Sequence, residues 1–172
     1  AFAQVASHAL GTFGIEHRFY HLDSTTFSLH GDYSQDEAAP EAIEITHGYS
    51  RDHRPDLKQA VLSLICSYRS RLPVWLEALS GNQADNASFP ETIKAYVEQL
   101  EAGEETYFIA DSALYSKQNI QDLSQVRWIT RVPATLKAVK ILYQTLEPEY
   151  MQPAVQEGYR VTKMCSTYGG VR

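Results

Sequence analysis

The run RFYHLDSTTFSL, residues 18–29, places one carboxylate in the middle of a strand-like segment. The side chains around Asp23 are aromatic, β-branched or hydroxyl-bearing, and such residues favour β-strands. An ionised carboxylate among them is costly to bury unless it binds a cation or several hydrogen-bond donors. We therefore expect a buried strand in which Asp23 either binds a ligand or caps a turn as a structural acid.

A second acid follows a short apolar run in YFIADSALYS, residues 107–116. Residues 107–110 form a predicted strand, Asp111 lies at its C-terminal end, and Ser112 leads into a predicted helix. Asp111 can therefore also cap that helix. Two strands that each bring one acid to a shared edge are typical of two-metal nuclease sites. Asp23 and Asp111 are accordingly the candidate metal ligands.

Length and composition favour a single domain. The chain has 172 residues, and 44% of them are hydrophobic, which is sufficient for one core. Because the sequence has no apolar run of membrane-spanning length and no signal-like N-terminus, we expect a cytoplasmic protein without a membrane partner. Cys66 and Cys165 lack a metal-type spacing and are predicted to be free thiols. Both termini favour a truncated fragment, since the first residue is Ala1 and no closing element follows the last strand-like stretch.

The distribution of charge is more informative than its sum. A formal net charge of -6 argues against a general nucleic-acid coat protein. Residues 51–71 nevertheless contain five Lys or Arg against two Asp, and residues 117–140 contain five Lys or Arg against one Asp. We expect these two basic segments to lie beside the two acid-bearing strands.

Hydrophobic patterns predict the elements of the first half. Residues 30–42 are polar and turn-rich, as in a loop, whereas residues 43–49 alternate apolar and polar side chains as strands do. Residues 57–70 fit either a helix or a strand, and their propensity favours the helix. Residues 73–79 are predicted to be a strand.

The second half alternates strands and helices. Residues 81–89 are a predicted loop, and Pro90 is predicted to open a helix that Gly103 ends. The elements predicted after the strand at 107–110 are a short helix at 116–123, a strand at 126–132 and a helix begun by Pro133. This alternation implies parallel strands joined by crossovers.

Five motifs follow one another along the chain. They are YHLDSTTFSLHGDY, ITHGYSRDHRPDLKQAVL, the LSGNQAD loop, YFIADSALYSKQNI and RWITRVPATLK. In order and spacing they resemble the DDE transposases of bacterial insertion sequences, in particular insertion-sequence family four and its close relatives. The resemblance runs from about residue 17 to the C-terminus. These transposases carry a β-rich insertion inside a ribonuclease H-like catalytic domain.

The resemblance implies an α/β fold, namely a ribonuclease H-like mixed sheet with flanking helices that is incomplete at the C-terminus. Because that fold begins with three antiparallel strands, it implies strands at residues 58–69 and 73–80, against the propensity of the first. It divides the chain into an N-terminal remnant or linker at 1–16, a partial catalytic core at 17–146, and the start of a β-rich insertion at 147–172.

The resemblance also assigns the candidate site. It places Asp23 on the first strand and Asp111 on the fourth, adjacent and parallel, as catalytic ligands of two Mg²⁺ or Mn²⁺ ions with Asp23 bridging both. Carboxylate oxygens prefer such hard cations. Two ions about 4 Å apart activate a water or a 3′-hydroxyl and stabilise the departing oxygen at phosphorus.

The third acid of the family is expected to be missing. The family carries a glutamate after the insertion, in the pattern Tyr, two residues, Arg, three residues, Glu, six residues, Lys, and no tyrosine here begins that pattern. Glu147 follows Asp111 at the spacing of compact retroviral-type integrases. A helix from Pro133 would place it roughly 20 Å from the strand end at 1.5 Å per residue. Glu147 is therefore the less favoured third ligand.

Residues 47–58 are densely polar. The basic residues of this segment that suit DNA binding are Arg51, His53, Arg54 and Lys58. These side chains fit contacts to DNA phosphates or a local ion-pair network with Asp52 and Asp56, and both alternatives stay open. Arg131 is a further DNA-binding candidate. A zinc site at His47 and His53 is disfavoured, because their spacing is not a recognised ligand pattern.

The resemblance implies that the parent protein cuts transposon ends and joins them to target DNA. Its implied partners are both DNAs, with a homodimer in the synaptic complex. We expect this chain alone to be inactive, because the third acid is missing. The alternatives are a non-catalytic remnant that keeps the scaffold and a metal-dependent nuclease on the same fold.

Overall fold

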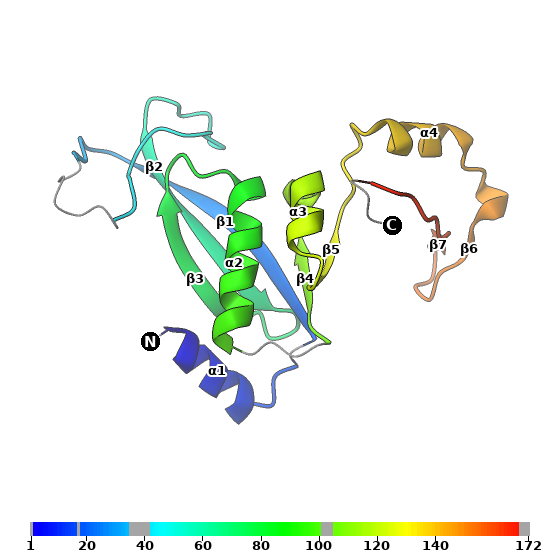
Figure 1. Cartoon of the computed structure of the whole chain (residues 1–172), viewed down its shortest axis with the longest axis horizontal. Coiled ribbons are helices and arrows are strands. Elements are labelled where there is room, and N and C mark those ends of the chain that lie inside the picture. Colours follow the sequence, from blue (N-terminus) through cyan, green and yellow to red (C-terminus); the bar gives the residue numbers. More distant parts are fainter. Residues whose placement is uncertain (1, 17, 35–41, 101–104, 169–172) are drawn as a thin grey trace.

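A five-stranded mixed sheet forms the centre of the computed structural model, which describes residues 2–16, 18–34, 42–100 and 105–168. Its strands are β1 (Phe19–Leu29), β2 (Lys58–Ser67), β3 (Pro73–Ser80), β4 (Tyr107–Ala110) and β5 (Arg127–Thr130). They lie in the order β3-β2-β1-β4-β5 (Figure 1). The pairs β1–β2 and β2–β3 are antiparallel, whereas β4 runs parallel to both β1 and β5. This arrangement confirms the expected ribonuclease H-like mixed sheet.

Strand β2 confirms the expectation from the family resemblance and overturns the helix that propensity favoured. It lies between β1 and β3, so both of its backbone edges are hydrogen-bonded in ladders. Burial alternates along the strand with a period of two, and Val61, Ser63 and Ile65 face the core. Tertiary pairing therefore outweighs local preference, which is a weak prior for any single segment.

The helix α2 (Asp85–Leu100) covers one face of the sheet (Figure 1). Its Tyr96 lies edge-on to Tyr20 of β1 and Phe108 of β4, with ring centroids 5.3 and 5.7 Å apart. All three aromatic side chains are buried. The helix α1 (Phe2–Thr12) packs beside β3 and adds Ala6 and Leu10 to the same core. Residues expected to be a remnant or linker thus include a packed helix.

The predicted start of the second helix was wrong, because α2 begins at Asp85 and contains Pro90. A proline has no N–H to donate, so the carbonyl of Asn86, four residues earlier, loses its helical partner. The side-chain amide of Asn119 donates to this carbonyl at 2.9 Å and to the carbonyl of Leu114 at 3.2 Å. This substitute hydrogen bond allows α2 to continue through Pro90, the residue at which the sequence predicted that the helix begins.

Several other predicted boundaries also changed. Residues 43–49 form only an isolated bridge between Thr46 and Gln59, not a strand. The helix α4 (Lys137–Thr145) begins four residues after Pro133. Part of the predicted loop at 30–42 and the predicted helix end at Gly103 lie outside the described residues.

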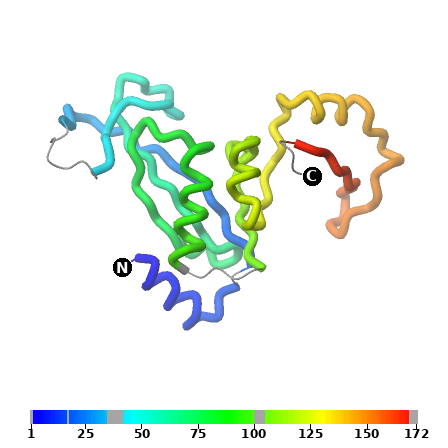
Figure 2. Tube along the Cα trace, in the orientation of Figure 1, coloured from blue at the N-terminus to red at the C-terminus, as the bar shows by residue number. Residues whose placement is uncertain are grey.

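The predicted short helix at 116–123 is confirmed as α3 (Lys117–Asp122), preceded by the 3-10 turn η1 (Ser112–Leu114). After β5 the chain leaves the sheet, as the Cα trace in Figure 2 shows. This arm contains α4, which has no buried residue, and the short elements η2 (Pro148–Tyr150), β6 (Gln152–Pro153) and β7 (Arg160–Val161).

Two further expectations concern membranes and thiols. Every helix within the described residues is too short or too polar to cross a lipid bilayer. Cys66 and Cys165 are free thiols, as predicted, and burial raises the pKa of the Cys66 thiol.

The amide of Asn119 gives the first testable prediction. Replacing it by alanine removes this donor from the part-buried carbonyl of Asn86, which costs about 1–3 kcal/mol of unfolding free energy. The carbonyl of Leu114 keeps the N–H of Ser116 at 3.0 Å. Gln118, its neighbour, donates from its side chain to the exposed Asp122 and is the matched control. Chemical denaturation should show a clear loss for Asn119→Ala and little for Gln118→Ala. Equal midpoints for the two variants would mean that Asn119 does not support α2.

Candidate functional site

The two candidate acids lie at the same level on neighbouring strands. In the parallel β1–β4 pair, His21 lies opposite Ile109, so two residues further along Asp23 lies opposite Asp111. The backbone of Asp111 is still extended, with φ -73° and ψ -176°. Adjacent strands are about 4.8 Å apart. Continued past its last pair, this register sets Asp23 level with Asp111, which is 88 positions away in the sequence.

Asp23 is exposed, so the expectation of a buried acid was wrong. Side chains alternate between the two faces of a strand. Leu22 and Ser24 are buried on the face that α2 covers, and Asp23 projects from the opposite face. The strand is partly buried because Tyr20 and Leu22 pack in the core, while the Asp23 carboxylate keeps its access to solvent and ions.

A local backbone N–H orients each carboxylate. Oδ1 of Asp23 accepts from the N–H of Ser24, and Oδ1 of Asp111 accepts from that of Ala113, both at 2.8 Å. Asp111 is thus also the N-cap of η1, so its predicted capping role is confirmed. For the other oxygen of each carboxylate, the described part of the chain supplies no hydrogen bond or ion pair. Two exposed, pre-oriented carboxylates fit a hard divalent cation.

No third protein ligand joins this pair within residues 2–16, 18–34, 42–100 and 105–168. Among these residues, no group of three His, Cys, Asp or Glu side chains is placed to hold a metal ion. Glu147 lies between α4 and η2, on the arm that leaves the sheet (Figure 1). His47 and His53 likewise form no such group.

The end of β5 holds the turn that carries Asp111. The hydroxyl of Thr130 donates to the main-chain carbonyl of Asp111. The next residue, Arg131, donates from Nη2 to the hydroxyl of Ser112 at 3.3 Å. Within the described residues Arg131 has no acidic partner. Its exposed positive charge therefore lies one residue away from a candidate metal ligand.

The basic residues of the 47–58 segment have intramolecular partners. Arg54 donates from Nε and Nη2 to the two oxygens of Asp56 at 2.8 and 2.6 Å. The ion-pair network predicted as one alternative for this segment is therefore present at Arg54 and Asp56. Lys58 donates to the carbonyls of Asp32 and Tyr33. His53 is exposed, with a left-handed φ of 57°.

Arg51 forms an ion pair with Asp85, at 2.6 Å, rather than with the predicted partner Asp52. Sequence patterns assigned Asp85 only to a loop, and they did not single out Ser24, which Arg51 also contacts. The only available signal was a polar residue at each of these positions. Their contact depends on the folded sheet.

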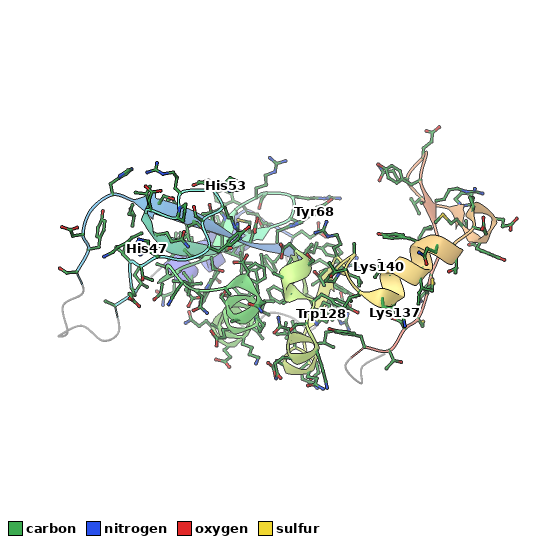
Figure 3. The ribbon with its side chains drawn as sticks, turned by 90° about the horizontal axis from the view of Figure 1, so that it is seen from above. His47, His53, Tyr68, Trp128, Lys137 and Lys140 are labelled. Carbon is green, nitrogen blue, oxygen red and sulfur yellow. The ribbon has the colours of Figure 1, made fainter. Side chains whose placement is uncertain are left out.

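The two basic segments do not form one surface. Figure 3 shows His53 over the strands on the left and Lys137 and Lys140 on α4 to the right. The first segment adjoins β1 through Arg51 and Lys58. The second adjoins β4 and the Asp111 turn through Arg127 and Arg131, whereas Lys137 and Lys140 lie on the arm. The expectation that both segments lie beside the acids is therefore met in part.

A family model described as "Transposase DDE domain" matches residues 15–167. No curated protein sequence matches the chain. Among solved structures, the chain is similar to the "Mos1 transposase paired-end complex with left transposon end", with 10% identity over 78% of this chain and 40% of that one and a TM-score of 0.42.

A second similar structure is the "Crystal structure of the Mos1 Strand Transfer Complex", with 11% identity over 84% of this chain and 46% of that one and a TM-score of 0.42. The chain thus spans less than half the length of these two Mos1 chains.

The Arg54–Asp56 pair gives a pH prediction. The hydrogen bonds from Arg54 lower the pKa of Asp56 from 3.8 to about 2. A lowered pKa adds stability above pH 3.8 that is lost as the pH falls toward 2. Replacing Arg54 by glutamine should raise the NMR titration midpoint of Asp56 toward 3.8, whereas Arg69→Gln should leave it unchanged. An unchanged midpoint in Arg54→Gln would contradict the pairing.

Proposed function

Because the chain belongs to the transposase DDE domain family, we propose that it is part of an enzyme that cuts DNA at transposon ends and joins these ends to target DNA. The observation that carries this proposal is the parallel β1–β4 register, which, continued two residues past its last pair, sets Asp23 level with Asp111. The proposal extends to the bacterial insertion-sequence family four and its close relatives, which the five sequence motifs support.

Asp23 and Asp111 would hold Mg²⁺ or Mn²⁺, two ions in the complete site with Asp23 shared by both. Such ions, when bound, activate the attacking water or 3′-hydroxyl and stabilise the departing oxygen in an in-line displacement. The chain's own contribution is orientation: the N–H groups of Ser24 and Ala113 each fix one carboxylate oxygen. The second oxygen of each carboxylate would be left to bind the cation.

The donor set also limits what residues 1–172 do by themselves. Divalent affinity rises with the number of charged ligands, and the described residues contain no group of three or more His, Cys, Asp or Glu side chains that could hold a metal ion. We infer that this chain alone binds the cation weakly and does not carry out strand transfer. The same observation favours a second candidate function, a non-catalytic scaffold that binds DNA without cutting it.

For the domain organisation we propose a catalytic core at 17–146 and the start of a β-rich insertion at 147–172. The short β6–β7 pair in the second segment supports this division. The partner would be DNA, at transposon ends and target, with a homodimer in the synaptic complex.

DNA phosphates would contact the cationic side chains near the acids. Arg131 is the best placed of these, because it adjoins the Asp111 turn and has no acidic partner in the described part of the chain. His53 and Lys58 extend this set on the β1 side. Arg54 would contribute less, because Asp56 already offsets its charge.

A Mn²⁺ titration tests the metal site. Wild type should bind the ion, and Asp23→Ala or Asp111→Ala should each weaken binding about tenfold or more, since even residues that only support a ligand change affinity by 10–100-fold. Asp122→Ala, which removes an exposed acid on α3, is the control and should bind as wild type does. Identical titrations for wild type and the double variant Asp23→Ala, Asp111→Ala would refute the metal assignment.

Salt-dependent DNA binding tests the phosphate contact of Arg131. For Arg131→Ala, fluorescence anisotropy with duplex DNA should show weaker binding. The slope of log affinity against log salt should also fall by about 0.9, the value for one lost phosphate contact. Lys163→Ala, on the arm, is the control and should keep the wild-type slope. If Arg131→Ala keeps both affinity and slope, Arg131 does not bind a phosphate.

A further inference from the structure

Every polar group of Ser24, the residue after Asp23, has a partner. Its N–H donates to the Asp23 carboxylate at 2.8 Å. Its carbonyl accepts from Nη1 of Arg51 at 2.8 Å, and its hydroxyl accepts from Nη2 of Arg51 at 3.1 Å. The same hydroxyl donates to Oδ1 of Asp85 at 2.5 Å. Ser24 is itself 5% exposed, and its four contacts are part-buried.

Arg51 and Asp85 complete a closed network around Ser24. Nη2 of Arg51 donates to Oδ2 of Asp85 at 2.6 Å. Both oxygens of Asp85 are thus occupied, one by Ser24 and one by Arg51. Charge-assisted bonds from a planar guanidinium are short and directional. This network, which we call the Ser24 clamp, joins three segments: β1, the loop that carries Arg51, and the first residue of α2.

The clamp lies where the sheet no longer supports β1 on its β4 side. The paired residues of β1 and β4 end at His21 and Ile109, and β4 itself ends at Ala110. A backbone carbonyl beyond this point needs another donor, and for Ser24 that donor is Arg51. Arg51 therefore substitutes for a strand partner one residue after Asp23.

The loop that carries Arg51 is itself docked on the sheet. Backbone bonds of 3.2 and 2.8 Å join Thr46 and Gln59, and the Gln59 side chain donates to the carbonyl of Gly81 at 2.7 Å. A Cβ on Gly48 would lie 2.0 Å from the carbonyl oxygen of Gly81, and one on Gly81 would lie 2.0 Å from that of Gln59. Only glycine allows this close approach, which sets the position from which Arg51 reaches Ser24.

We propose that Arg51, Asp85 and Ser24 are positioning residues for the metal site, with Arg51 acting through Ser24 on Asp23 rather than through a DNA phosphate. This inference rests on the proposed metal-binding function. Asp85 already offsets the charge of Arg51, and a phosphate would have to displace it from a 2.6 Å contact. Arg131 is the contrasting arginine, because it donates to the hydroxyl of Ser112 and has no acidic partner among the described residues.

The test compares Mn²⁺ affinity with folding. Arg51→Ala should weaken Mn²⁺ binding about tenfold, the lower end of the effect of groups that orient metal ligands. Arg51→Lys should recover part of this loss, because lysine can pair with Asp85 but cannot bond the carbonyl and hydroxyl of Ser24 together. Arg69→Ala, which breaks an exposed ion pair with Glu16 at 3.8 Å, is the matched control and should bind Mn²⁺ as wild type does.

A smaller change keeps the test decisive if Arg51→Ala does not fold. Ser24→Ala removes only the hydroxyl shared by Arg51 and Asp85, and should weaken Mn²⁺ binding about threefold, as expected for one modest hydrogen bond. Circular dichroism and thermal unfolding establish that each variant is folded at the temperature of the titration. A purely structural residue would lower the unfolding temperature without changing the affinity of the folded fraction.

Each outcome has a distinct meaning. The inference is overturned if folded Arg51→Ala or Ser24→Ala binds Mn²⁺ as tightly as wild type, or if Arg51→Lys is no better than Arg51→Ala. If wild type itself does not bind Mn²⁺, or binds it independently of Asp23 and Asp111, the proposed function fails instead. A loss of DNA affinity in Arg51→Ala with Mn²⁺ affinity unchanged would identify Arg51 as a phosphate contact and would also overturn the inference.

Discussion

The parallel pairing of β1 with β4 is the contact on which the candidate site depends. Only three residue pairs join the two strands, so their backbone hydrogen bonds alone stabilise the pairing weakly. Packing of Tyr20 and Phe108 beneath Tyr96 of α2 adds a buried aromatic cluster to that ladder. A shift of one residue would turn Asp23 toward α2, where its charge would be buried. The core that stabilises the pairing therefore also sets its register.

Polar contacts complete this arrangement at the edge where the ladder ends. On the β1 side Arg51 bonds Ser24, the residue after Asp23, and on the β4 side Arg131 bonds Ser112, the residue after Asp111. The two arginines differ in their surroundings, because Asp85 offsets the charge of Arg51 while Arg131 faces no described acid. Similar contacts thus leave one positive charge compensated inside the fold and the other open to a phosphate.

Sequence patterns were most informative where one physical cause dominated. The aromatic and β-branched content of β1 and the apolar run of β4 predicted both strands, and the alternation of strands and helices predicted parallel pairing. They misplaced the start of α2, since the compensation for Pro90 comes from Asn119, 29 positions away. They also favoured a helix for β2, whose strand form depends on partners on both sides.

The sequence by itself determined which groups are available for chemistry: two aspartates at strand positions, each followed by a serine, with arginines nearby in a negatively charged chain. Tertiary structure alone decided that β4 pairs with β1, that both carboxylates are exposed, and that Arg51 turns toward Asp85 rather than Asp52. Local pattern encodes what each segment prefers. Strand register, side-chain burial and the choice of ion-pair partner depend on segments that come into contact only when the chain folds around its core.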